Sequence, residues 1–289
     1  MGTLNIIASL SGPAAAQFGG ASSATQAGGG AKPSLDRVVQ TYVALRQGGA
    51  AQAQVTSTAL INALIAERGV PGLQKFMSIY NEAFATSTSR NRAPTQIPAN
   101  VEARIQSLPE ATQQHDARVA WPLNDGHIDA FRHAYCTARL TCEFGGAWAE
   151  QFASAHEGND PGNSKTGGMD LHNNHVGCRI ALANPGASPA QLADLVKNAL
   201  ERGELVVIDR SGELNWSNQV AIGHHGVPIP YMNMPIVRGE WICPIGCNLR
   251  KRGQCDGALS CPLASILGAE GLETCQVPRI EAVDLSARI

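Results

Sequence analysis

Apolar residues recur every three to four positions along the first part of the chain, which is the spacing of helices that bury one face. One such stripe contains Leu35, Val38, Tyr42 and Leu45 and ends at Gly48. Similar stripes predict three further helices, over residues 55–67, 73–84 and 101–108. The aromatic residues of the 73–84 stripe are expected to belong to the core.

Polar side chains are most concentrated between residues 125 and 180, where the spacing predicts three more helices. On the first, Asp129 and His133 are four residues apart and therefore share one face. On the third, Asp170, Asn174 and Gly177 share a face. Because Gly177 allows two helix backbones to approach closely, we expect these polar faces to converge.

The second helix of this group begins near Ala147 and ends at the dipeptide His156-Glu157, just before the loop-forming Gly158 and Pro161. Its end therefore brings an imidazole and a carboxylate towards the same region.

The period of the pattern changes towards residue 204. Ser188 and Gln191 have the spacing of a capping box, which predicts a helix that runs to about Glu201. Residues 204–208 and 213–216 then alternate with a period of two on either side of a turn, which predicts a β-hairpin.

These elements predict a mainly α fold, a helical bundle with a small β-hairpin and a Cys-rich irregular C-terminal region. Residues 1–33 are rich in Ala, Gly and Ser and are expected to be a flexible leader, because they bury too little apolar surface to offset the entropy of ordering. The N-terminal helical region is expected to cover residues 34–115. A motif-bearing helical domain with the hairpin follows over 116–240, and the Cys-rich region over 241–289.

The cysteines bear on the compartment in which the protein works. Five of the eight lie within residues 241–289, and their spacing lacks the paired C-x2-C of common zinc knuckles. Disulfides are therefore favoured over zinc thiolates, which predicts an oxidising compartment. The N-terminus lacks the charged region of a signal peptide, which leaves a non-classical export route, a signal trimmed from this sequence, or cytosolic thiols.

Charge and hydropathy exclude some partners. The net charge is -2 at pH 7, and the single basic cluster spans only residues 250–252, so nucleic acid is not an expected partner. No run approaches the 18 apolar residues of a membrane span, so no transmembrane segment is expected. His224-His225 resembles the start of a His-metal nuclease finger, but no histidine follows it.

The clustered polar residues offer groups for acid–base and metal chemistry. The catalytic candidates are His133, Asp129, Arg132, Glu157 and Asp170. The binding candidates are Asn173, Asn174 and His172, and the candidate metal ligands are His156, His172 and Asp170.

Two mechanisms remain open at these residues. A divalent metal ion could lower the pKa of a bound water, with a carboxylate as general base. Alternatively, His133 is a general base oriented by Asp129 or Asp170, and Arg132 or the amides of Asn173 and Asn174 stabilise an oxyanion. The competing interpretation is a buried polar network that only holds helices together.

The combination of D-A-F-R-H-A, H-E and D-L-H-N-N over residues 129–174 resembles an uncharacterised bacterial domain family, often found at the C-terminal ends of secreted or toxin-like proteins. The resemblance covers about residues 121–218. It implies a helical domain from bacteria and no established reaction.

From these features we expect a secreted bacterial effector, an antibacterial toxin that hydrolyses a cell-envelope component, peptidoglycan or lipid. It would act in the periplasm or envelope of a target bacterium, with an immunity protein and a secretion apparatus as partners. The alternatives are a non-enzymatic binding or structural module and a cytosolic toxin directed at nucleic acid.

Overall fold

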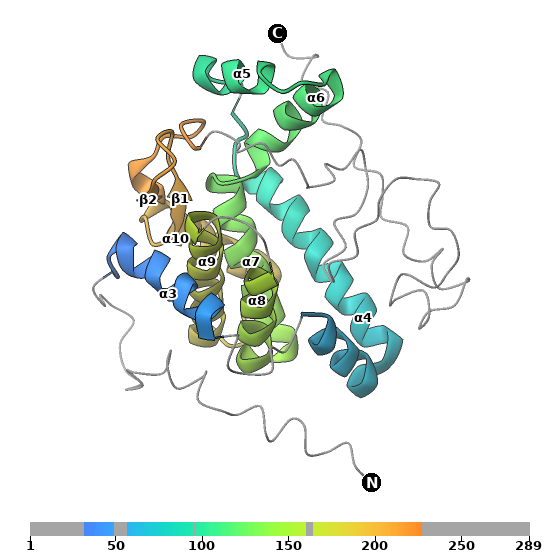
Figure 1. Ribbon diagram of the computed structural model, residues 1–289. Coiled ribbons are helices and arrows are strands. Elements are labelled where there is room, and N and C mark those ends of the chain that lie inside the picture. Colours follow the sequence, from blue (N-terminus) through green and yellow to red (C-terminus); the bar gives the residue numbers. More distant parts are fainter. Residues whose placement is uncertain (1–31, 49–56, 95, 160–163, 227–289) are drawn as a thin grey trace, which may run out of the picture. The chain divides into compact units, whose positions relative to one another are not determined.

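The computed structural model describes residues 32–48, 57–94, 96–159 and 164–226 (Figure 1). These residues form a two-stranded hairpin and eight α-helices, which confirms the mainly α fold. The helices are α3 (Leu35–Gly48), α4 (Ser57–Arg90), α5 (Ala99–Gln106), α6 (Ala111–Ala120), α7 (His127–Phe144), α8 (Gly146–Asn159), α9 (Ser164–Ala183) and α10 (Pro189–Glu201). The hairpin consists of β1 (Val206–Ile208) and β2 (Leu214–Trp216), and short 3-10 turns span Trp121–Leu123 and Ser217–Gln219.

Two of the expected regions fall largely outside the described residues. These are the leader, of which only the last two residues are described, and the whole Cys-rich region 241–289. Cys136, Cys142 and Cys178, which precede that region, are free thiols. None of the helices in the described part of the chain combines the length and apolarity of a membrane span.

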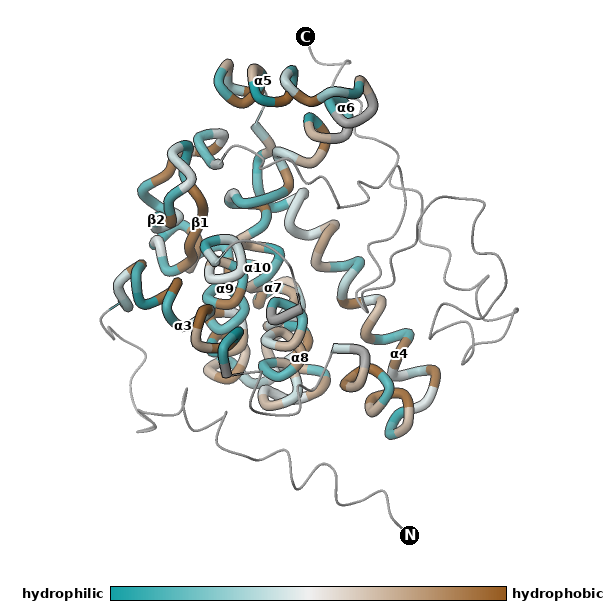
Figure 2. The backbone as a smooth tube through the Cα atoms, viewed as in Figure 1, coloured by the Kyte–Doolittle hydropathy of each residue, from teal (hydrophilic) through white to brown (hydrophobic). Residues whose placement is uncertain are grey.

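Helix α7 lies at the centre of the helical packing, in contact with α4, α8, α9 and α10. Apolar and polar residues alternate within the turns of the helices (Figure 2), which is the pattern that buries one face of each. The aromatics of α4 are core residues, as the sequence predicts: Phe76 is fully buried, and its ring centroid lies 5.0 Å from that of Phe152 in α8.

The contact between α7 and α9 depends on a residue without a side chain. A Cβ atom at Gly177 would lie 1.9 Å from the carbonyl oxygen of Ala134 in α7, so any larger residue forces the two backbones apart. The close approach expected at Gly177 is therefore confirmed. It brings the polar face of α9 that carries Asp170 and Asn174 against α7.

Local signals place the next elements correctly. The Ser188 hydroxyl accepts from the backbone N–H of Gln191, and the Gln191 side chain accepts from the backbone N–H of Ser188, so the capping box is present. β1 and β2 pair antiparallel, with Val207 opposite Asn215. Both the helix start and the hairpin agree with the sequence pattern.

Two details differ from the expected elements. The stripes over 55–67 and 73–84 form one element, α4, bent at Gly69, whose φ of 65° interrupts the helical conformation. The sequence pattern misses α6, because its ten residues carry few apolar positions; among them, Ala117 packs with Val101 and Trp121 in a small satellite core.

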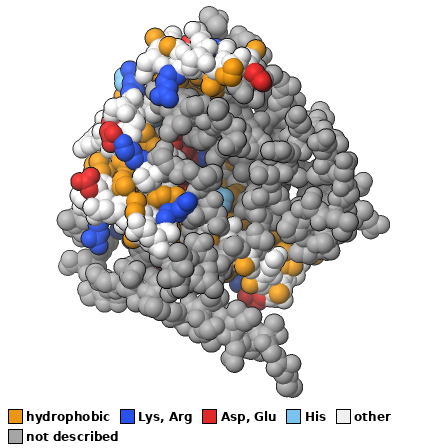
Figure 3. Space-filling model, viewed as in Figure 1, with side chains coloured by type: hydrophobic (Ala, Val, Ile, Leu, Met, Phe, Trp, Pro, Cys, Tyr) orange, Lys and Arg blue, Asp and Glu red, His pale blue; other side chains and the backbone are white. Residues whose placement is uncertain are grey.

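Charged side chains are dispersed on the face shown in Figure 3. There, the Lys and Arg groups of the described residues alternate with Asp and Glu groups and form no extended basic patch.

Candidate functional site

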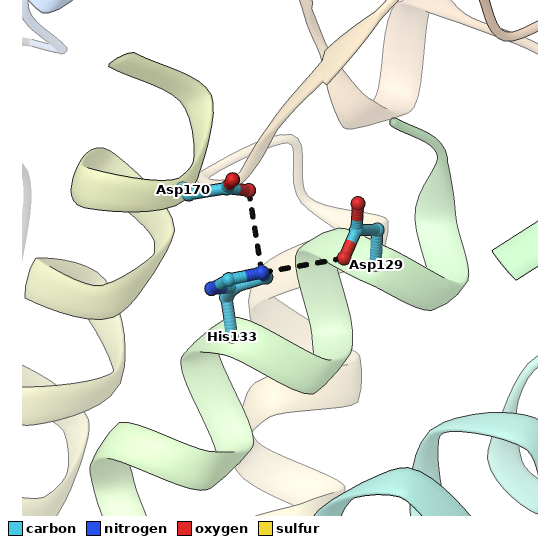
Figure 4. A group of neighbouring side chains, drawn as sticks. All are labelled: Asp129, His133 and Asp170. Atoms are coloured by element: carbon cyan, nitrogen blue, oxygen red, sulfur yellow. Dashed lines mark ion pairs between the residues drawn. The ribbon is translucent and has the colours of Figure 1, made fainter. Parts of the chain in front are cut away.

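Three carboxylates from three helices surround the ring of His133. Figure 4 shows two of them, Asp129 and Asp170. Its Nε2 lies 3.3 Å from Asp129 Oδ1, one turn earlier on α7, and 3.4 Å from Asp170 Oδ1 on α9. Its Nδ1 lies 3.6 Å from Glu157 Oε1 at the end of α8. The convergence predicted from the sequence therefore brings together four of the five catalytic candidates.

Asp129 is fixed from both sides at the start of α7. Its Oδ2 accepts a hydrogen bond of 2.7 Å from the backbone N–H of Asp125, a residue with a positive φ of 60°. Its Oδ1 accepts from the Arg132 guanidinium, the fifth candidate, which also donates to the Leu123 carbonyl. Burial by itself raises the pKa of Asp129, but Arg132, His133 and the Asp125 N–H outweigh this and lower it to about 2.

Glu157 is held by a chain of hydrogen bonds from the other two helices. The Thr137 hydroxyl donates to Asn174 Oδ1 at 2.9 Å, and Asn174 Nδ2 donates to Glu157 Oε1 at 3.1 Å. Tyr42 of α3 donates to the Glu157 backbone carbonyl at 3.3 Å. The Glu157 side chain is thereby directed at His133 rather than at solvent.

Asp170 differs from the other two carboxylates because one of its oxygens is not satisfied. Its Oδ1 is buried and has no hydrogen-bond partner among the described residues; the Nε2 of His133 at 3.4 Å is beyond good hydrogen-bond geometry for a carboxylate. Burial raises the pKa of Asp170 well above its ordinary value, although His133 acts to lower it.

His133 is the member of the group that reaches towards solvent, since its side chain is 17% exposed while those of Asp129 and Glu157 are 5% and 3% exposed. Burial lowers the pKa of His133, but Asp170 and Asp129 outweigh it and raise the pKa to about 10. Without another cation, the ring is therefore protonated at neutral pH.

The same side chains could hold a metal ion. Asp129, His133 and Asp170 each offer one ligand atom, and these three atoms lie within 4.8 Å of one another. Imidazole nitrogen and carboxylate oxygen are ligands of zinc and of other divalent transition ions.

Two histidines predicted as metal ligands lie elsewhere, and the prediction is corrected accordingly. A ring nitrogen of His172 pairs with the Glu204 carbonyl at 2.9 Å, and burial lowers the pKa of this histidine to about 4. The ring of His156 stacks on Phe152. Neither belongs to the group around His133 that could hold an ion; of the predicted ligands only Asp170 does.

Asn173 also has a structural position. Its amide donates to the Val206 carbonyl and accepts from the Val206 N–H, each at 2.9 Å, so it pairs with β1 like a neighbouring strand. Asn174 supports Glu157 instead. The predicted role of this amide pair in stabilising an oxyanion is therefore not supported by their contacts.

The sequence reading missed Thr137, although a signal for it was present. Thr137 follows His133 by four residues and so lies on the same face of α7, where it meets Asn174. Cys136, one position before Thr137, is buried, and burial raises the pKa of its thiol to about 12, which does not favour a thiolate nucleophile at neutral pH. His225 stacks on Trp121 and bonds its carbonyl, a structural position.

The described fold and site define a mainly α protein with a mostly buried histidine–carboxylate centre. Residues 75–204 match a family model described as a domain of unknown function (DUF6973). This stretch contains His133 and all three carboxylates around it, so the chain is similar to an uncharacterised domain family in the part that forms the centre. Searches of curated proteins and of solved structures gave no match.

Proposed function

We propose that this protein is a hydrolase whose reaction takes place at the His133 centre. The observation that carries the proposal is the convergence of Asp129, Glu157 and Asp170, each from a different part of the chain, on one partly exposed histidine. Hydrolysis needs a group that removes a proton from water and a group that protonates the leaving atom. An imidazole and the buried carboxylates 3.3–3.6 Å from it are groups of the type that supply these two functions.

We also propose that the substrate belongs to the bacterial cell envelope, either peptidoglycan or lipid, and that the protein acts there as a secreted antibacterial effector. The support is the concentration of cysteines in residues 241–289, the dispersed charge of the described residues on the face shown in Figure 3, and the resemblance of the motifs to secreted and toxin-like proteins. An immunity protein that neutralises the effector is part of this proposal.

The test is expression of the full chain in a bacterial host, once with an added export signal and once without it. We expect growth arrest or lysis only after export, and we expect His133→Ala to abolish it. His175→Ala is the matched control, because His175 lies on α9 but pairs with the exposed Glu150 instead. Equal toxicity of the wild type and His133→Ala would refute catalysis at His133.

A second experiment identifies the bond that is cleaved. Purified protein is incubated with isolated peptidoglycan and, separately, with vesicles of bacterial phospholipids. The soluble products are then separated and identified by mass spectrometry. Release of fragments from one of the two assigns the substrate class. Toxicity without export, with no product from either material, would favour a cytosolic target.

One observation favours a second candidate, a structural polar network. Asp129 and Glu157 are 3% and 2% exposed as whole residues, as deeply buried as many core residues. In that case His133→Ala would lower the free energy of unfolding by several kcal/mol, as breaking buried ion pairs does. Neither envelope material would then be degraded by the wild type.

A further inference from the structure

We infer that Asp129, His133 and Asp170 are the three protein ligands of a tetrahedral divalent transition ion of the zinc type, and that Glu157 positions His133 for it. The catalytic meaning of this ion rests on the proposed function. Its binding, however, is argued from the arrangement of the side chains alone.

The spacing of the ligand atoms is the first argument. An ion about 2.0–2.1 Å from its ligands holds tetrahedral neighbours about 3.3–3.4 Å apart. The Nε2 of His133 lies 3.3 Å from Asp129 Oδ1 and 3.4 Å from Asp170 Oδ1. These two spacings are those of neighbouring ligands on a tetrahedral ion, and the third pair of ligand atoms, from Asp129 and Asp170, lies within 4.8 Å.

The unsatisfied oxygen of Asp170 is the second argument. Buried polar atoms are nearly always paired, and Oδ1 of Asp170 is buried, points at His133 and has no hydrogen-bond partner among the described residues. A cation between the three groups would satisfy it. Arg132 also donates to Oδ1 of Asp129, but a carboxylate oxygen has two lone pairs, so one remains for the ion.

The balance of charge is the third argument. Carboxylates that bind a metal ion are ionised, so with the ion bound the three carboxylates around His133 carry three negative charges and Arg132 carries one positive charge. With a neutral His133 ring, two negative charges remain, which a divalent ion neutralises. Ca²⁺ and Mg²⁺ prefer oxygen ligands alone, whereas an imidazole ligand is typical of zinc and its neighbours.

Glu157 is placed to orient the histidine. A histidine that binds a metal through Nε2 usually donates its Nδ1–H to a carboxylate or carbonyl, which fixes the tautomer and the ring plane. Glu157 Oε1 lies 3.6 Å from Nδ1 of His133, an ion-pair distance that is longer than a hydrogen bond, and it is held there by Asn174, which Thr137 holds in turn. Glu157 is therefore a positioning residue, whose carboxylate acts on the ion through His133.

Three protein ligands leave the fourth position of a tetrahedral ion to water, as in catalytic zinc sites, where the ion lowers the pKa of that water towards 7. His133 is the most exposed of the three ligands, so this position is expected on its side of the cluster.

The experiment uses the purified full chain, stripped with a chelator, and titrates it with ZnCl₂ by calorimetry. We expect the Asp170→Asn variant to bind one zinc ion fewer per chain than the wild type. Glu157→Gln is expected to keep the stoichiometry and to weaken the affinity about 10- to 100-fold. Glu150→Gln, on the same helix as Glu157 but in an exposed pair with His175, is expected to change the affinity less than twofold.

Two measurements distinguish zinc bound by cysteine thiolates from zinc bound at His133. Alkylation of the thiols before titration removes such binding, and Co²⁺ substitution gives the intense near-ultraviolet charge-transfer band only with thiolate ligands. A tetrahedral Co²⁺ site without sulfur shows visible absorption alone, and this band is expected to shift in Glu157→Gln. Circular dichroism checks that each variant is folded.

Unchanged stoichiometry in a folded Asp170→Asn variant, or no ion bound by the alkylated wild type, would overturn the inference. If no ion binds and His133→Ala still abolishes envelope hydrolysis, the proposed function stands and the reaction is metal-free. If the ion binds as described and no envelope material is cleaved, the metal centre stands and the proposed function is wrong.

Discussion

Two of the polar contacts of helix α7 are built differently. Towards α4, the Arg139 guanidinium donates to both oxygens of Glu82 at 3.0 Å, and the Tyr135 hydroxyl donates to the same carboxylate. Around His133, one carboxylate of α7 itself and two from α8 and α9 lie 3.3–3.6 Å from the ring nitrogens. We refer to these as the Glu82 contact and the His133 centre.

In the Glu82 contact the charges are paired and the carboxylate oxygens accept hydrogen bonds. One carboxylate meets one guanidinium in two parallel hydrogen bonds, the geometry that best offsets the loss of hydration. The His133 centre has an excess of carboxylates, distances too long for good hydrogen bonds, and one buried oxygen without a hydrogen-bond partner in the described part of the chain. Such an excess of carboxylates is expected where a further cation or a reacting group binds. It distinguishes a functional site from a contact that only holds helices together.

The largest expected effect comes from Gly177, which sets the α7–α9 distance beneath the His133 centre and leaves the Glu82 contact alone. Gly177→Ala places a Cβ 1.9 Å from the Ala134 carbonyl oxygen, a backbone atom that cannot move aside cheaply. We expect the free energy of unfolding in urea to fall by about 3 kcal/mol, the upper range for overpacked cores. We also expect zinc affinity to fall.

Gly168→Ala is the control on the same helix. Its Cβ would lie 3.4 Å from the Val38 carbonyl oxygen, close to ordinary contact, and alanine is the better helix former by about 1 kcal/mol. We expect little change or a gain in stability. Equal losses from the two variants would show that the close approach at Gly177 is unimportant.

Gly177 also shows how much of the structure is readable in the sequence. Helical periodicity gives the faces of α7 and α9, and the missing side chain indicates a close approach. Periodicity does not say which of two adjacent residues, His156 or Glu157, faces the neighbouring helix, since the two differ by about 100° around the axis.

Other errors have the same origin. His172 and Asn173 precede Asn174 directly, yet they bind the backbone of Glu204 and Val206. The packing of the hairpin against α9 decides which groups these two side chains bind, and local sequence patterns do not predict that packing. Capping boxes and hairpin turns are local, which is why residues 188–216 were predicted well.

The second prediction compares carboxylate removal in the two contacts, in protein freed of metal with a chelator. Glu82→Gln leaves the Arg139 guanidinium without its anion, and we expect a loss of about 1–2 kcal/mol. Asp170→Asn removes a buried charge that lacks a hydrogen bond, and we expect no loss, or a gain of up to about 1 kcal/mol. Urea unfolding measures both.

The expected result is a loss of stability from Glu82→Gln and no loss from Asp170→Asn. A loss from Asp170→Asn as large as that from Glu82→Gln would show that the His133 centre is a satisfied network, and would favour the structural interpretation. With saturating ZnCl₂ present, we expect the wild type to be more stable than Asp170→Asn, because only the wild type then gains stability from the bound ion.

The third prediction is the pH dependence of the Glu82 contact. Burial raises the pKa of Glu82, but the hydrogen bonds from Arg139 and Tyr135 outweigh this and hold it below its ordinary value. A carboxyl with a lowered pKa contributes stability above its unfolded-state value of about 4.5, and loses it as pH falls through the folded-state value. The difference in unfolding free energy between wild type and Glu82→Gln should therefore be constant from pH 6 to 8 and shrink below about pH 4.5.

The smallest expected effect concerns an ion pair between the helices that supply Glu157 and Asp170. Glu150 of α8 lies 3.4 Å from His175 of α9, and both side chains are more than two-fifths exposed. Exposed pairs contribute about 0–1 kcal/mol, because water screens them and ordering long side chains costs entropy. We expect Glu150→Gln to change the free energy of unfolding by less than about 0.5 kcal/mol. A loss comparable to that of Glu82→Gln would mean that any charged contact at the α8–α9 junction is important, and the surplus of carboxylates around His133 would no longer distinguish that centre from its surroundings.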